Sequence, residues 1–197
     1  MRVLVIFCHP CEDSFNAALY RTAVTALSGV GHELRCHDLY REGFQPVMTP
    51  EERKTYMTTT EPLLTRNAQH IQDLRWCDAL IVIYPTWYYG PPAMLKGWLD
   101  CVWLPGVTFS VAEGKGKLAR LELTNIKRFV GITTSGSPWW WLKLIGDPGR
   151  KLWTRGLFMP ILTRTRTSWL QLYNMNHTTD ASRAAFLTRI DRRLRKL

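Results

Sequence analysis

The sequence lacks the features that mark several large classes of protein. Its five cysteines are an odd number, and we expect neither structural disulfides nor a zinc site, which favours a reducing compartment. Cys8 and Cys101 stand in apolar surroundings typical of buried thiols. No apolar run approaches the roughly 20 residues of a membrane-spanning helix. The apolar start has no small-residue cleavage site after it, so we expect a cytoplasmic protein without an integral membrane segment.

Nucleotide-binding signatures rich in glycine are also missing. The sequence contains neither GxGxxG nor GxxxxGK[ST], which excludes the Rossmann dinucleotide fingerprint and the P-loop. It has no internal repeat, linker or low-complexity stretch, so residues 1–197 are predicted to form a single domain.

Acidic residues are scarce relative to basic ones, 16 against 26, and the formal net charge is +10. Much of the excess lies towards the C-terminus, in Arg164, Arg166, Arg189, Arg192, Arg193, Arg195 and Lys196. Nucleic acid is one class of partner that such charge attracts. A solvated basic helix face, or attraction for phosphorylated cofactors, is the other interpretation. Because no nucleic-acid-binding motif accompanies the charge, we expect no nucleic-acid partner.

The most informative stretch runs from Ala79 to Val102. It begins with a short apolar run, 79–84, that predicts a strand buried on both faces of a parallel sheet. A loop with three prolines follows over 85–92, and a helix is predicted from Ala93. The loop contains Trp87, Tyr88 and Tyr89, which either cap the core or bind a flat aromatic ligand. Loops at the carboxyl ends of parallel strands are where such folds bind ligands.

Strands and helices alternate along the rest of the chain, which predicts a doubly wound α/β fold. Ser14 is expected to cap a helix through about Leu27, whose first amide groups, near Phe15 and Asn16, form an anion site. A capping box is predicted at Thr49–Glu52, and another N-cap at Thr179. The remaining expected strands are Val3–Cys8, Glu33–His37, Arg128–Thr133 and one within Ile161–Tyr173. The remaining helices are Pro62–Arg75, Arg150–Leu157 and one after Thr179 whose apolar face holds Leu187, Ile190 and Leu194. The segment Gly106–Lys117 is expected to cross the active face.

The order of several motifs resembles the flavodoxin-like NAD(P)H:quinone oxidoreductase family of the DT-diaphorase type. The resemblance covers nearly the whole chain. It rests on FCHPCEDSFNAAL (7–19), DLYREGFQPVMTPEE (38–52), YPTWYYGPPAMLKGWLD (84–100), TTSG (133–136) and MNHTTDASR (175–183). The last resembles a C-terminal segment of the FAD-binding branch.

This resemblance implies a five-stranded parallel sheet of order 2-1-3-4-5, a homodimer, and a flavin at the carboxyl ends of strands one, three and four. FAD is favoured over FMN. The matching cofactor-binding positions are His9, Ser14, Phe15, Asn16 and Ala18 for the pyrophosphate and ribityl chain, Pro85, Thr86, Trp87, Tyr88 and Tyr89 along the ring, Thr133, Thr134, Ser135 and Gly136 on its pyrimidine side, and Met175 and Arg183 near the adenosine.

The activity implied is ping-pong hydride transfer from NAD(P)H through the flavin to a quinone or similar aromatic acceptor. Trp87 and Tyr88 are the candidate catalytic residues, stacking on and positioning the rings, with no acid or base assigned. Backbone donors between Thr133 and Gly136 are expected to stabilise negative charge on the reduced ring. The partners implied are small-molecule substrates, and no metal is implied.

One departure concerns proton delivery. Well-known members of the family carry a Tyr and a His after the TTGG motif, whereas residues 137–145 here contain neither and instead include Trp139, Trp140 and Trp141. Tryptophan donates a hydrogen bond but does not titrate. Water is then the alternative proton source. The tryptophans either shape the pocket for another acceptor or form a dimer interface.

Two other functions stay open. One is a regulatory flavoprotein subunit of a membrane transport system of the potassium-efflux type, with a membrane protein as partner. The other is a one-electron flavodoxin-like carrier, which the strong positive charge disfavours.

Overall fold

The computed structural model describes residues 1–110, 120–157 and 165–197. Five parallel strands form the main sheet, in the spatial order β2 (Glu33–Asp38), β1 (Arg2–Phe7), β3 (Ala79–Pro85), β6 (Arg128–Thr134) and β7 (Arg166–Leu172). Numbered along the chain, these five strands have the order 2-1-3-4-5, so the predicted fold class and strand order are confirmed. Two short strands, β4 (Phe109–Ser110) and β5 (Arg120–Leu121), form a separate antiparallel pair.

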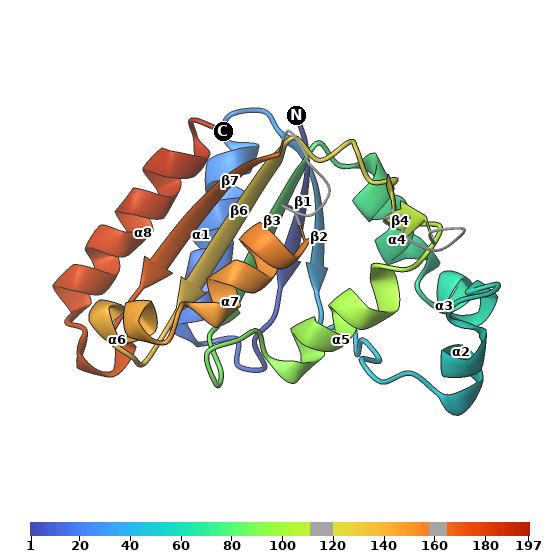
Figure 1. Ribbon diagram of the computed structural model, residues 1–197. Helices are drawn as coiled ribbons and strands as arrows, with labels where there is room; N and C mark the ends of the chain where they lie inside the picture. Colours follow the sequence, from blue (N-terminus) through green and yellow to red (C-terminus); the bar gives the residue numbers. More distant parts are fainter. Residues whose placement is uncertain (111–119, 158–164) are drawn as a thin grey trace.

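Helices cover both faces of the sheet (Figure 1). Residues of α1 (Phe15–Ser28) and α8 (Asp180–Leu194) share one core with Val3, Val5 and Ile81. Residues of α3 (Glu61–Arg66), α4 (Ala68–Trp76) and α5 (Ala93–Val102) share the other core with alternate strand residues such as Leu4 and Val82. Successive side chains of a strand point to opposite faces, so both faces of β1 and β3 are buried as their apolar sequences predict.

The predicted helix starts are present. The Ser14 hydroxyl accepts a hydrogen bond from the Ala17 amide at 3.1 Å, and the Thr49–Glu52 capping box begins α2 (Pro50–Thr55). Thr179 caps α8. Of the predicted apolar face of α8, Ile190 and Leu194 are fully buried and Leu187 is partly buried, and Phe186 completes it.

The helix predicted from Pro62 to Arg75 is wrong in one respect, because it is two helices, α3 and α4, separated at Asn67. The buried side-chain amide of Asn67 donates to the carbonyl oxygens of Leu63 at 3.0 Å and of Cys101 at 3.1 Å. The second bond ties the break to α5. A tertiary hydrogen bond that a local pattern does not contain therefore divides the helix.

The second half of the chain also differs in detail from the prediction. Trp139–Leu144 forms α6, and the helix expected from Arg150 begins at Pro148 as α7 (Pro148–Lys151) and continues as a π-helix, η1 (Leu152–Leu157). After β7, a 3₁₀ turn, η2 (Met175–His177), leads to α8. Much of the predicted excursion over 106–117 lies outside the described residues. Among the helices of the described residues, none has the length and apolar character required to cross a bilayer.

Candidate active site at the carboxyl ends of the strands

Three segments that are far apart in sequence meet where β1, β3 and β6 end. The Thr86 amide donates to the Thr134 carbonyl oxygen at 2.7 Å, and the hydroxyls of Thr86 and Thr133 lie 2.9 Å apart. The side-chain nitrogen of Asn16 donates to the Thr134 hydroxyl at 3.1 Å. These bonds fix the start of α1 and the loop after β3 against the end of β6. The structure thus brings together the first three groups of residues predicted for the flavin site.

The aromatic residues of the loop form a tight turn under backbone strain. The amide and carbonyl groups of Trp87 and Gly90 exchange two hydrogen bonds of 3.0 Å. The residues between them, Tyr88 and Tyr89, have φ angles of 46° and 64°. Positive φ at both central positions is the pattern of a type I′ turn, which usually contains asparagine and glycine. Bulky residues are uncommon there, and such strain concentrates at ligand sites.

A cavity of about 400 Å³ opens beside this turn. It is lined by Thr86, Tyr88, Tyr89, Ser135, Gly136 and Ser137. Tyr88 is fully exposed and Trp87 is 44% exposed, so their ring faces are available to a ligand. The cavity lies within the size range of cofactor and small-molecule sites, and its aromatic wall suits a planar ring system.

Not every backbone amide predicted to face the flavin is free to do so. The Ser135 amide donates to the Leu172 carbonyl oxygen at 2.9 Å, and the Ala18 amide donates to that of Ser14 at 3.1 Å. The expectation of donors throughout 133–136 is therefore too broad. Within the described parts of the chain, the amides of Phe15, Asn16 and Gly136 have no hydrogen-bond acceptor. They are the donors that an anionic or carbonyl-bearing ligand would meet.

Asn16 supplies an independent sign of a ligand. Its side chain is only 5% exposed, yet its Oδ1 atom has no hydrogen-bond partner. A buried polar atom without a partner costs free energy that a bound group would recover. The atom lies on the residue that joins α1 to Thr134, so a hydroxyl or N–H donor of a bound flavin would fit it. The residues present therefore suit the cofactor that the resemblance implies.

Met175 and Arg183, the two C-terminal candidates, are connected by hydrogen bonds to the loop at the carboxyl end of β6. The Met175 amide donates to the Ser135 carbonyl oxygen at 2.9 Å. Arg183 Nε donates to the Thr178 hydroxyl at 3.0 Å, and that hydroxyl also donates to the Met175 carbonyl oxygen at 2.8 Å. The start of α8 is thereby joined to the loop after β6.

His9 and its neighbours border the aromatic turn. The His9 and Trp87 ring centres are 6.4 Å apart, and the Cys11 amide donates to His9 Nδ1 at 3.0 Å. Cys8 and Cys11 have the CxxC spacing of redox dithiols, but burial raises the pKa of the Cys8 thiol to about 12. A thiol that does not ionise is a poor nucleophile, so this pair does not suit a redox role. All five cysteines are free in the structure.

Two further residues hold the aromatic turn: Trp141, one of the tryptophans expected either to shape the pocket or to form a dimer interface, and Gly149, whose role was not predicted from the sequence. Trp141 Nε1 donates to the Tyr89 hydroxyl at 3.1 Å, so α6 holds the tip of the aromatic turn. Gly149, in α7, lies so close to the turn that a Cβ atom there would be 2.6 Å from the Tyr89 carbonyl oxygen. The single proline and two glycines at 146–149 marked a break in the chain, but they gave no sign of which loop this segment would contact.

A second polar cluster lies at the end of β2, where His37, Glu42 and His70 offer ligand atoms within 4.8 Å of one another. Trp98 Nε1 lies 3.2 Å from His70 Nδ1 and donates to it, so in neutral His70 the proton is on Nε2, the nitrogen that faces Glu42. His37 Nε2 is 2.7 Å from Asp73. These contacts suit a network of hydrogen bonds and ion pairs better than a metal centre.

The chain is similar in sequence to proteins that are named as nicotinamide-linked dehydrogenases. A ribosyldihydronicotinamide dehydrogenase-like protein, traD, of Penicillium crustosum is 36% identical over 132 residues, which cover 59% of this chain and 49% of that protein. NAD(P)H dehydrogenase (quinone) 1 of Rattus norvegicus is 29% identical over 151 residues, or 69% of this chain and 54% of that protein. The chain therefore spans about half the length of these curated relatives.

Solved structures agree over the whole fold. The NAD(P)H:quinone oxidoreductase from Methanothermobacter marburgensis superposes with a TM-score of 0.82 at 25% identity, covering 99% of this chain and 96% of that one. Residues 1–192 match the family model described as a flavodoxin-like fold. With this match and the strand order together, the chain belongs to the family of flavodoxin-like proteins.

Proposed function

We propose that this protein is a flavin-dependent NAD(P)H oxidoreductase that reduces a quinone or a similar aromatic acceptor, with FAD as the bound flavin. The observation that carries the proposal is the strained aromatic turn at Tyr88 and Tyr89 beside a cavity of about 400 Å³. The names of the relatives, which include NAD(P)H dehydrogenase (quinone), support the same class of reaction. When bound, the flavin supplies two-electron hydride transfer.

The chain's own residues would bind and orient the reacting molecules. Phe15 and Asn16 would donate their amides to the phosphate end of the flavin, where the N-terminus of α1 favours negative charge. Gly136 would donate to the pyrimidine edge of the ring. Trp87 and Tyr88 would form the wall against which the nicotinamide and then the acceptor stack, so both substrates use one cavity in turn. Met175 and Arg183 would contact the adenosine of FAD, as the resemblance implies.

Tyr89 is the group best placed to deliver a proton. Its hydroxyl accepts a hydrogen bond from Trp141, which leaves its own O–H to donate into the cavity that it lines. A donor at this position would stabilise negative charge on the acceptor oxygen. It would also take the place of the Tyr and His that are missing from 137–145.

A homodimer is part of the proposal, because α6 exposes large apolar side chains next to the cavity. Trp139, Trp140 and Leu144 are 56%, 60% and 72% exposed. A patch of this kind usually marks an interface. The alternative, a regulatory subunit of a membrane transport system, draws no support from the relatives named above.

The test is a spectrum of the purified protein, acid release and chromatography of any chromophore, and anaerobic titration with NADPH. We expect a bound FAD that is bleached by NADPH and reoxidised by a quinone. Release of FMN would overturn the choice of cofactor. A protein that binds neither flavin after attempted reconstitution would overturn the whole assignment.

A further inference from the structure

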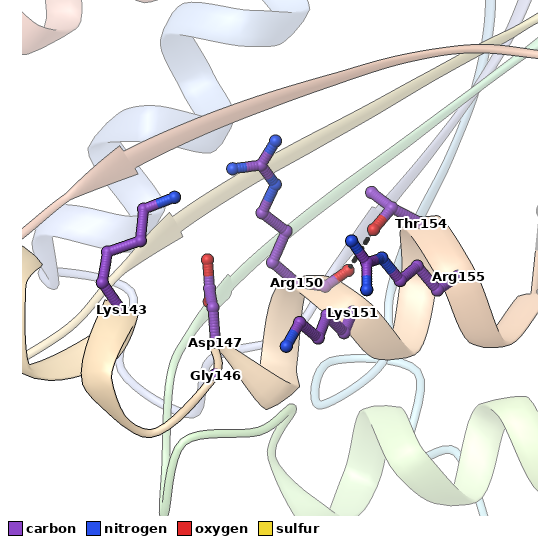
Figure 2. Close-up of a pocket in the computed structure, with 7 residues that line it drawn as sticks. All are labelled: Lys143, Gly146, Asp147, Arg150, Lys151, Thr154 and Arg155. Atoms are coloured by element: carbon purple, nitrogen blue, oxygen red, sulfur yellow. Dashed lines mark hydrogen bonds between the residues drawn. The ribbon is translucent and has the colours of Figure 1, made fainter.

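A second cavity, of about 320 Å³, lies between α6 and the helical segment formed by α7 and η1 (Figure 2). It is lined by Lys143, Gly146, Asp147, Arg150, Lys151, Thr154 and Arg155. Four of these side chains are cationic and one is anionic. Figure 2 shows Lys143, Asp147 and Arg150 extending to the same side of the turn that joins α6 to α7. The cavity is therefore strongly basic.

The protein offsets the positive charge of this cavity only in part, through the single carboxylate of Asp147. Among the described residues, none of the four cations lies within 4.0 Å of a carboxylate. The Nζ atom of Lys143 lies 5.7 Å from the centre of the Trp139 ring. Four like charges around one small cavity repel one another, and a bound anion would relieve that repulsion. Two of the cations are arginines, which suit phosphate oxygens by bidentate hydrogen bonding.

The backbone of this segment is also unusual. Asp147 has a positive φ of 50° at the start of α7, and the chain then widens into the π-helix η1. Single-turn π-helices are rare and are frequent at functional sites. Here the wider turn carries Arg155, and Thr154 donates its hydroxyl to the Arg150 carbonyl oxygen at 3.0 Å. This short segment therefore contributes three of the four cations that line the cavity.

The basic cavity adjoins the proposed flavin site. Gly149 of α7 lies against the carbonyl oxygen of Tyr89, and Trp141 of α6 donates to the Tyr89 hydroxyl. Tyr89 lines the aromatic cavity and also contacts α6 and α7, the two helices that flank the basic cavity. A nucleotide whose nicotinamide stacks at Tyr88 would extend its phosphate-bearing end past Tyr89.

We propose that the basic cavity, built by Lys143, Arg150, Lys151 and Arg155, binds the 2′-phosphate of NADPH and makes NADPH the preferred hydride donor. This proposal rests on the proposed function. The 2′-phosphate is a monoester with close to two negative charges near neutral pH, which matches a cavity with three more positive than negative groups. NADH lacks this group.

The test combines a double substitution, Arg150→Gln with Lys151→Gln, and a matched control. The control is Arg166→Gln with Lys196→Gln in another basic cavity of about 300 Å³, whose lining includes Arg128, Arg166, Arg193 and Lys196 and which lies at the amino ends of β6 and β7, away from the carboxyl ends of the strands. Both variants lose two positive charges. Titration calorimetry of the flavin-loaded proteins with adenosine 2′,5′-bisphosphate and with 5′-AMP measures binding without turnover.

We expect the first variant to lose roughly tenfold or more of its affinity for the bisphosphate, with little change for 5′-AMP. Its kcat/KM ratio of NADPH to NADH should fall by a similar factor, while activity with ribosyldihydronicotinamide, a donor without phosphate, stays the same. The control variant should match the unaltered protein.

Equal losses with NADPH and NADH would overturn the proposal, because the cavity would then bind the diphosphate that both share. Equal losses of bisphosphate affinity in the two double variants would also overturn the proposal, because the effect would then come from the protein's overall positive charge and not from this cavity. A protein without bound flavin or activity refutes the proposed function instead. In that case, bisphosphate binding that depends on Arg150 and Lys151 would still support the phosphate site.

Discussion

Tyr88 and Tyr89 have backbone conformations that lower stability, while their rings are placed to serve the proposed site. A left-handed conformation costs a residue with a bulky side chain about 1–3 kcal/mol. The turn keeps this conformation because the bonds between Trp87 and Gly90 close it on both sides. Asparagine or glycine would form the same turn with less strain, so the presence of tyrosine favours a role for the rings.

Tyr88→Asn should therefore raise stability and lower activity. Asparagine tolerates positive φ, and the exposed Tyr88 ring (102% exposed) makes few contacts that would be lost. We expect the free energy of unfolding to rise by about 1 kcal/mol and kcat/KM with NADPH to fall about tenfold or more. Chemical denaturation and steady-state kinetics measure the two effects. Unchanged kinetics would remove Tyr88 from the proposed wall.

Asn16→Leu tests the unpartnered oxygen. Leucine has a similar volume, and the buried Oδ1 atom forms no hydrogen bond to lose, although the bond to Thr134 disappears. We expect stability without flavin to change by less than about 1.5 kcal/mol, whereas the dissociation constant for flavin should rise roughly tenfold or more. Fluorescence titration of the apoprotein measures that constant. Equal flavin affinity in the two proteins would mean that Asn16 does not contact the cofactor.

At the scale of the element, the strands were predictable and the breaks in the helices were not. The strands β1 and β3 consist of apolar residues that only a sheet buried on both faces can accommodate. The break at Asn67 depends on a bond to Cys101, 34 residues away, and α7 becomes a π-helix without any local signal in the sequence. Local patterns predict the elements, and tertiary contacts decide where they bend.

The end of β2 carries a cluster that should make stability depend on pH. Burial and then the charge of His37 lower the pKa of His70 from its ordinary value of 6.5 to about 4. Between those values the unfolded chain binds a proton at His70 and the folded protein does not, so stability falls as the pH drops through this range. For His37, burial lowers the pKa, but Glu42 and Asp73 outweigh it and raise the pKa overall. Its contribution is instead lost as the pH rises through that raised pKa.

His70→Gln should make the free energy of unfolding depend less on pH below about 6.5. Glutamine can still accept from Trp98 and donate to Glu42, but it does not titrate. Because of His70, we expect the free energy of unfolding of the unaltered protein to fall by on the order of 3 kcal/mol between pH 6.5 and 4. The variant should lack this part of the fall. Urea unfolding at several pH values provides the comparison. Parallel profiles would show that His70 is not responsible.

At the scale of the molecule, the site could be predicted because strand ends in a doubly wound sheet converge. The loops after parallel strands are expected to converge at the carboxyl ends, and the family resemblance singled out Asn16, Thr86 and Thr134 within those loops; the structure brings the three together. The basic cavity was not predicted, because its cations lie on α6, α7 and η1, and only their packing against Tyr89 connects them to the site. Much of the excess of basic residues noted in the sequence lies from residue 164 onwards, whereas the basic cavity is formed by residues 143–155.

The exposed apolar side chains of α6 lead to a prediction about assembly. We expect the protein to sediment as a dimer, and Trp140→Lys with Leu144→Lys to raise the dissociation constant by about a hundredfold or more, because a lysine at an apolar interface must be desolvated. Analytical ultracentrifugation over a range of concentrations measures this. A substitution of Val47, which is 75% exposed and lies on a different segment, to lysine is the control. A monomer at all concentrations would contradict the proposed interface.

The order of the strands in the sheet also has a consequence for synthesis. β1 pairs with β2 and β3, so three strands can assemble once about the first half of the chain has left the ribosome. β3, with the sequence ALIVIYP, is then an uncharged edge strand until residues 128–134 emerge to pair with it. Exposed apolar edges pair readily with other chains. During those few seconds, the strand that ends up at the centre of the sheet is the part of the nascent chain most prone to aggregate.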